Sequence, residues 1–143
     1  MSVLTTTGLH HVRLTCTDIA RSRKFYEDVL GFTVVAESPG DPSDPAVRVD
    51  PFQLVGGVVF GVGGLLIGLR PVADPTDSFE STRVGLDHIS FGVETRADLE
   101  AAAVALEAAG VPHGEVIEMA SFGIAILSFS DPDGVHLELT SPA

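Results

Sequence analysis

The chain has 143 residues, the length of one domain or of two small modules with a shared core, and it can bury roughly 70% of its unfolded surface. It carries 8 Lys and Arg against 20 Asp and Glu residues, and the net charge of −12 argues against nucleic acid or an anionic membrane as a partner. The single cysteine, Cys16, permits no internal disulfide, no apolar run is long enough to span a bilayer, and the N-terminal residues lack a signal region. We therefore expect a soluble, cytoplasmic protein.

The first half of the sequence is predicted to alternate strands with one helix. From His11 to Cys16 polar and apolar residues alternate, which indicates a strand. Its apolar face carries Val12, Leu14 and Cys16, which is expected in the core, and its polar face carries His11, Arg13 and Thr15. Several prolines between residues 38 and 52 favour an irregular loop. The regular elements expected in this half are a strand over 9–15, a helix over 18–30 that Thr17-Asp18 caps, a strand over 32–37, and a hairpin of strands over 53–60 and 65–70.

The same pattern restarts after a linker over residues 71–85. The elements expected in the second half are a strand over 86–93, a helix over 97–109 that Thr95 caps, a strand over 115–119, and a hairpin of strands over 124–129 and 135–140. The order of strand, helix and three strands thus occurs twice, in a first module over 9–70 and a second over 86–140. Alignment of the glycine turns in the two closing hairpins pairs Gly68 with Glu138.

Four segments in this order resemble the vicinal oxygen chelate superfamily, which includes glyoxalase I, extradiol dioxygenases, methylmalonyl-CoA epimerase, fosfomycin-resistance proteins and bleomycin-binding proteins. They are His11-Val-Arg-Leu-Thr-Cys-Thr-Asp18, Ser22-x-x-Phe25-Tyr26-x-x-Val29-Leu30-Gly31-Phe32, Leu86-Asp-His88-Ile-Ser-Phe and Asp131-Pro-Asp-Gly134-x-x-x-Glu138. The resemblance covers about residues 9 to 140. It implies an α+β fold in which one domain contains two tandem βαβββ modules. Their strands would form an open, curved mixed sheet around a cup, with the helices packed outside.

The resemblance also implies metal ligands on the first and last strand of each module. Three of these four positions hold His11, His88 and Glu138, whereas the fourth holds Gly68, which cannot bind a metal. The alternation independently puts each of the three on the polar face of its strand. Two imidazoles and one carboxylate leave coordination positions open for water or a substrate on a divalent ion, which could be Fe, Mn, Ni, Zn or Mg. The opposing interpretation is two hydrogen-bonded strand histidines and a solvated glutamate.

Further residues are candidates for contact with the ligand or with the metal-binding side chains. They are Arg13, Arg70, His136, Ser90, Ser128 and Phe122. The two arginines could bind an anionic or oxygen-rich ligand, or form salt bridges with carboxylates of the cup, and these interpretations are evenly balanced. His136 shares a face with Glu138 but equally fits an exposed strand histidine, and Phe122 equally fits a loop residue that covers the core.

The resemblance implies a metal-dependent small-molecule enzyme in which a divalent metal ion grips two neighbouring oxygens of the substrate. Gly68 removes the carboxylate or amide that glyoxalase I and the epimerase usually carry, so a dioxygenase-like or lyase-like reaction is favoured. Ser128 stands where extradiol dioxygenases commonly place a tyrosine, and eight basic residues supply a poor cradle for a phosphonate such as fosfomycin. The alternative is a non-catalytic protein, similar to bleomycin-resistance proteins, that sequesters an antibiotic or another small ligand in a dimer groove. We expect a homodimer in either case, since the sheets have edges to cover.

Overall fold

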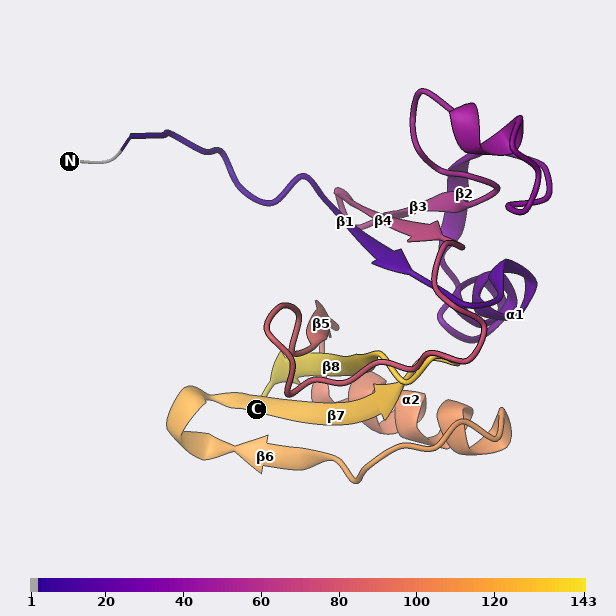
Figure 1. Ribbon diagram of the computed structural model, residues 1–143. Helices are drawn as coiled ribbons and strands as arrows, with labels where there is room; N and C mark the ends of the chain where they lie inside the picture. Colours follow the sequence, from indigo (N-terminus) through magenta and orange to yellow (C-terminus); the bar gives the residue numbers. More distant parts are fainter. Residues whose placement is uncertain (1–2) are drawn as a thin grey trace. The chain divides into compact units, whose positions relative to one another are not determined.

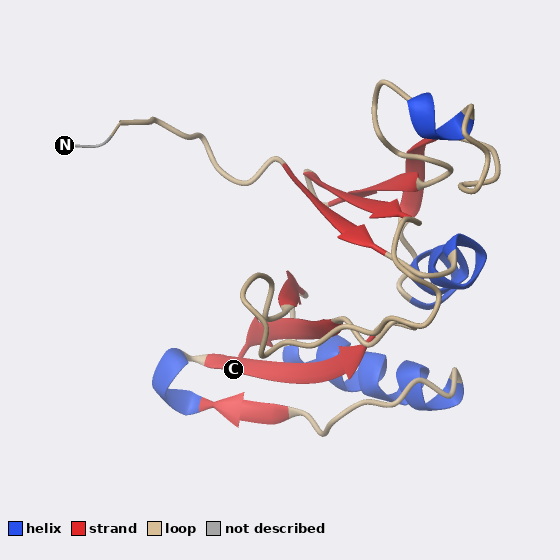
Figure 2. Ribbon diagram, viewed as in Figure 1, coloured by secondary structure: helices blue, strands red, loops and turns tan. Residues whose placement is uncertain are grey.

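The computed structural model describes residues 3–143, and the chain divides into two compact units, of which the first ends at Pro75 and the second begins at Thr76. Each unit contains one four-stranded sheet together with helical segments. Figures 1 and 2 show the strands as arrows and the helices as coiled ribbons. The arrangement confirms the predicted α+β class with two tandem βαβββ modules and open mixed sheets. No helix within residues 3–143 is long and apolar enough to cross a membrane. That the two units make up a single domain remains a prediction.

The first unit follows the predicted order of strand, helix and three strands. Its strands are β1 (His11–Thr15), β2 (Thr33–Glu37), β3 (Val58–Val62) and β4 (Leu65–Arg70), and its helical segments are α1 (Ile19–Lys24), the π-helix η1 (Phe25–Val29) and the 3-10 helix η2 (Val47–Val49). The strands lie in the order β1-β4-β3-β2. β1 runs parallel to β4, and the other neighbours are antiparallel.

The second unit repeats this topology. Its strands are β5 (Ile89–Gly92), β6 (Ile117–Met119), β7 (Ile124–Ser130) and β8 (His136–Pro142), and its helical segments are α2 (Arg96–Ala108) and the 3-10 helix η3 (Ala120–Phe122). The strand order β5-β8-β7-β6 matches that of the first unit, again with one parallel pair, β5 and β8. The internal repeat predicted from the sequence is therefore present in the fold.

Both helices begin at the residues that the sequence predicts as caps. The Asp18 carboxylate accepts the backbone N–H of Arg21, 3.1 Å away, at the start of α1. At the start of α2, Thr95 and Asp98 form a capping box, in which each side chain accepts the backbone N–H of the other residue. These bonds satisfy N–H groups that have no partner within the helix, so the two helix starts are fixed locally.

One face of each sheet forms a core with the helix of the same unit. In the first unit the Tyr26 ring stacks on Phe60 with centroids 5.8 Å apart, and both side chains are fully buried. In the second unit α2 packs on β7 and β8, and Leu99 of the helix and Leu127 and Leu137 of the two strands are buried. Cys16 is also buried, as predicted. Because neighbouring strand residues face opposite sides, the polar residues of β1, β5 and β8 lie on the other face of each sheet.

The hairpin strand predicted to begin at residue 53 begins instead at Val58. The chain before it is folded around Asp50, whose carboxylate accepts the backbone N–H groups of Phe52, Leu54 and Val55 at 2.9 to 3.3 Å. Gln53 and Val55 adopt left-handed backbone angles, with φ of 54° and 53°, which non-glycine residues rarely do. A side chain that binds the backbone locally thus overrides the strand preference of this apolar stretch.

Protonation of Asp50 is expected to weaken this turn. The N–H of Phe52 is the main cause that holds the pKa of the Asp50 carboxyl below its ordinary value, although burial opposes it. The stability that the carboxylate contributes is therefore present above its unfolded pKa, about 3.9, and is lost as the pH falls through the lower folded value. Thermal melts should show Asp50→Asn less stable than the wild type at neutral pH, with a gap that narrows below about pH 4.

The matched control for this experiment is Asp77→Asn, because within residues 3–143 Asp77 accepts only the neighbouring N–H of Ser78. A gap between the wild type and Asp50→Asn that stays constant down to about pH 3 would contradict the assigned role of the Asp50 carboxylate.

Candidate functional site

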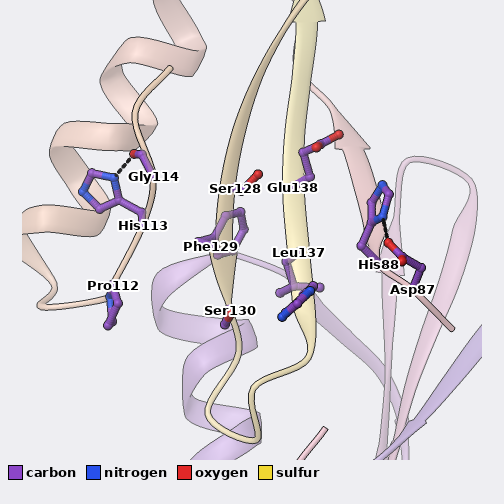
Figure 3. A pocket seen from close by; sticks show the side chains of 11 residues that line it. Asp87, His88, Pro112, His113, Gly114, Ser128, Phe129, Ser130, Leu137 and Glu138 are labelled. Carbon is purple, nitrogen blue, oxygen red and sulfur yellow. Dashed lines mark hydrogen bonds and ion pairs between the residues drawn. The ribbon is translucent and has the colours of Figure 1, made fainter. Parts of the chain in front are cut away.

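A cavity of about 420 Å³ opens on the polar face of the second unit (Figure 3). Its volume lies within the range typical of small-molecule sites. The polar side chains that line it include His88, His113, Ser128, Ser130, His136 and Glu138. Of the residues predicted from the sequence, His88, Ser128, His136 and Glu138 therefore lie together around one cavity.

Glu138 lies at the centre of this face, on β8 between the two neighbouring strands. The strand register sets it opposite Ser90 of β5 and Ser128 of β7. Thr140 Oγ1 donates to Glu138 Oε1 at 3.1 Å, and the Ser90 hydroxyl lies 2.5 Å from the same Thr140 oxygen. Because a hydroxyl has one hydrogen, Thr140 must accept from Ser90 if it donates to Glu138. This chain of bonds fixes one oxygen of the carboxylate that lines the cavity and does not involve the other.

His88 lies immediately before β5 and lines the same cavity as Glu138. Its Nδ1 is 2.5 Å from Oδ1 of Asp87, a contact drawn as a dashed line in Figure 3. A carboxylate at Nδ1 holds the hydrogen on that nitrogen and keeps the lone pair on Nε2, which is the tautomer that binds a metal ion. His88 and Glu138 are thus both oriented by hydrogen bonds to a neighbouring side chain, that of Asp87 for His88 and that of Thr140 for Glu138.

His113 is a cavity residue that the sequence analysis missed. It lies in the connection between α2 and β6, its Nδ1 donates to the Gly114 carbonyl at 2.7 Å, and a single bridge joins its backbone to Phe129 of β7. Its Nε2 is buried without a hydrogen bond, with a Glu107 carboxylate oxygen 3.4 Å away outside bonding geometry. Only the tertiary bridge brings His113 to this face, so no periodicity could have indicated it.

In the first unit, the polar face carries His11, Arg13 and Arg70. The parallel register of β1 and β4 sets Arg13 opposite Gly68, just as Ser90 lies opposite Glu138 in the second unit. The repeat alignment of Gly68 with Glu138 therefore agrees with the strand register. His11 Nδ1 lies 2.9 Å from His10 Nδ1, so one of these nitrogens carries a hydrogen and the other accepts it.

The remaining predicted residues have the following positions. His136 packs edge-on against Phe79, with ring centroids 5.6 Å apart, and its side chain is exposed at the cavity. Arg70 is half-buried, and its Nε has no hydrogen-bond partner among the described residues. Phe122 lies in η3 with 71% of its surface exposed, and it is not among the residues that line this cavity. The ligand-binding roles assigned to these residues stay predictions.

A metal site also requires enough ligands. Taken alone, neither unit gathers three His, Cys, Asp or Glu side chains in positions to hold a metal ion, within residues 3–143. The second unit supplies the pair of His88 and Glu138, and His11 belongs to the first unit.

The fold and the cavity define a class of protein with two βαβββ modules and a polar pocket of small-molecule size. Residues 8–139 match the family described as the Glyoxalase/Bleomycin resistance protein/Dioxygenase superfamily, and the chain belongs to this family. This confirms the resemblance found in the sequence.

Three relatives illustrate the similarity. The chain is 31% identical over 133 residues to the uncharacterized protein YaeR of Escherichia coli K12, covering 92% of this chain and 93% of YaeR. It is 28% identical over 138 residues to a protein of Arabidopsis thaliana named Glyoxylase I 4, covering 93% and 70%. The crystal structure of a glyoxylase/bleomycin resistance protein/dioxygenase domain from Frankia sp. EAN1pec superposes with a TM-score of 0.78 at 30% identity, covering 97% and 94%.

Proposed function

We propose that the protein is a metal-dependent enzyme acting on small molecules, in which His11, His88 and Glu138 bind one divalent metal ion. The observation that carries the proposal is the pair of His88 and Glu138 in one cavity, each oriented by an outer hydrogen bond. Outer partners of this kind are typical of metal-binding histidines and carboxylates. The ion would be Fe, Mn, Ni, Zn or Mg, and when bound it supplies a Lewis acid that polarises two neighbouring oxygens of the substrate.

The position of Gly68 narrows the proposed reaction. A fourth ligand or base at this position is missing, and the Arg13 side chain fills the space where it would stand. The residues present therefore favour a dioxygenase-like or lyase-like reaction over the proton transfers of glyoxalase I or an epimerase, which need a base. Within the cavity, Ser128 and His136 lie beside Glu138 along the sheet and would contact the bound substrate.

Elemental analysis of anaerobically purified protein tests the proposal directly. We expect close to one equivalent of a divalent metal per chain, followed by oxygen uptake or product formation with members of a panel of catechols and 2-oxo compounds. If the purified protein carries no metal and gains none on titration, the proposal of a metal-dependent enzyme is contradicted. That outcome would instead support the alternative, a non-catalytic protein that sequesters a small ligand.

We also propose that two copies of the chain form a homodimer. Val35 on the edge strand β2 is 57% exposed, and Ile117 on the corresponding edge strand β6 is 56% exposed. Unpaired strand edges with exposed β-branched residues are surfaces that proteins usually cover. Light scattering should therefore give twice the mass of 14.9 kDa, and Ile117→Lys should shift the protein toward a monomer. A monomeric mass for the wild type would contradict the proposal.

A further inference from the structure

The Arg13 side chain occupies the space that a side chain at position 68 would need. A Cβ atom built on Gly68 would lie 2.9 Å from Cγ of Arg13 and 3.6 Å from its Cδ. The first of these distances is shorter than real packing allows, so a residue larger than glycine would displace the arginine. At the matching register position of the second unit, Ser90 lies beside Glu138. The first unit therefore holds a cation where the second unit holds a carboxylate.

The far end of Arg13 is held by the turn around Asp50. Its Nη1 donates to the Phe52 carbonyl at 2.8 Å. This carbonyl directly precedes Gln53, which is left-handed like Val55 two residues later, and strained backbone of this kind concentrates at functional positions. Among the described residues this is the only side-chain hydrogen bond of Arg13. It uses one of the five N–H donors of the guanidinium. The guanidinium is thus held at one point, and its other N–H donors are available to a ligand.

The distribution of charge indicates that this ligand is an anion. Arg23, Lys24 and Arg96 each pair with a carboxylate of the chain. By contrast, within residues 3–143 no carboxylate oxygen lies within 4.0 Å of the charged groups of Arg13 or Arg70, although the net charge is −12. Both arginines lie on the polar face of the first sheet, with Arg70 two residues beyond Gly68 on β4. Two guanidinium groups without an internal counter-ion on one face suit an external carboxylate.

We propose that Arg13 is the residue that sets substrate specificity, and that the substrate carries a carboxylate in addition to its vicinal oxygens. Gly68 is required because only glycine leaves room for Arg13 to cross β4, and the Asp50 turn positions the guanidinium through Phe52. This inference rests on the proposed function, because the vicinal oxygens of the substrate are the two atoms that the proposed metal ion would bind. Arg13 binds the carboxylate and thereby holds the substrate in one orientation.

The test compares two ligands that differ in one charge, 3,4-dihydroxybenzoate and 3,4-dihydroxybenzamide, by calorimetry on the zinc-loaded protein. The wild type should bind the benzoate at least about tenfold more tightly than the benzamide. Arg13→Gln should abolish this preference while zinc binding is retained. Gly68→Ala should also reduce the preference, although it keeps the charge, because the added methyl displaces the Arg13 side chain. Equal binding of both ligands by the wild type, or an unchanged preference in either variant, overturns the proposal.

Arg48→Gln is the matched control, since Arg48 is an exposed arginine of the same unit whose Nε also donates to a backbone carbonyl, that of Pro42. It should retain the preference for the benzoate. Failure of the proposed metal site is recognised separately, by the absence of zinc binding in the wild type. In that case the metal-free, ¹⁵N-labelled protein is titrated with 3,4-dihydroxybenzoate. A shift of the Arg13 Nε–H resonance that the benzamide does not cause supports the proposal, and no shift overturns it.

Discussion

Replacement of Glu138 by Gln is expected to weaken metal binding by about 100-fold or more, while the fold is retained. Loss of an outer partner alone typically costs 10- to 100-fold in metal affinity, and Glu138 is proposed as a direct ligand. A glutamine keeps the shape of the side chain and a carbonyl oxygen that accepts from Thr140, so the local hydrogen bonds survive. What the substitution removes is the negative charge. Competition with a chromogenic chelator for Zn²⁺ measures the affinity, and a thermal melt checks the fold.

Two further variants make this experiment specific. Glu115→Gln removes an exposed carboxylate of the same unit, outside the cavity, and should leave the affinity unchanged. Thr140→Val removes the hydroxyl that orients Glu138 and should give an intermediate loss, about 10- to 100-fold. Wild-type affinity in Glu138→Gln would show that the carboxylate is not a ligand.

Gly57→Ala is expected to destabilise the first unit by about 4 kcal/mol or more, which is exceptional for the addition of one methyl group. A Cβ atom on Gly57 would lie 2.0 Å from the Leu69 carbonyl oxygen and 2.7 Å from that of Leu54. Both atoms belong to the backbone, so no side-chain rotation relieves the clash. The strand pairing of β3 with β4 begins at the next residue, where Val58 lies opposite Leu69. The methyl group would therefore push apart the strand that carries Gly68 and Arg70.

Denaturant unfolding followed by circular dichroism measures this effect. The matched control is Gly92→Ala on β5, because a Cβ atom there would meet nothing within 4 Å. The control should change the free energy of unfolding by no more than about 1 kcal/mol. Similar stability of Gly57→Ala and Gly92→Ala would contradict the close approach of β3 and β4 at Gly57.

Much of the fold follows from patterns that are local in the sequence. Alternation of polar and apolar residues predicts β1 and β8, and the capping residues Asp18 and Thr95 predict where the helices begin. The repeat predicts that Gly68 and Glu138 are equivalent, and the strand registers agree. The strand predicted to begin at residue 53 begins later because the Asp50 side chain binds backbone N–H groups that a strand would use. The alternation of polar and apolar residues contains no information about this competition.

Some residues of the candidate site could likewise be predicted from the sequence, and others could not. Sequence periodicity determines the face on which a strand residue lies, and so it brings His88, Ser128 and Glu138 to the polar face of the second sheet. It does not determine which distant residue fills a given space. The placement of His113 beside β7 depends on such long-range packing.

The sequence by itself thus determined the repeat, which depends on residue type and spacing alone, and through the family resemblance it also determined the fold class and the absence of a ligand at Gly68. Only the tertiary structure decided what stands in place of that ligand. Arg13 lies across Gly68 because β1 and β4, more than fifty residues apart, pair in one register, and because the Asp50 turn presents the Phe52 carbonyl to its guanidinium. A contact between three distant segments depends on their packing, which no local pattern of residues specifies.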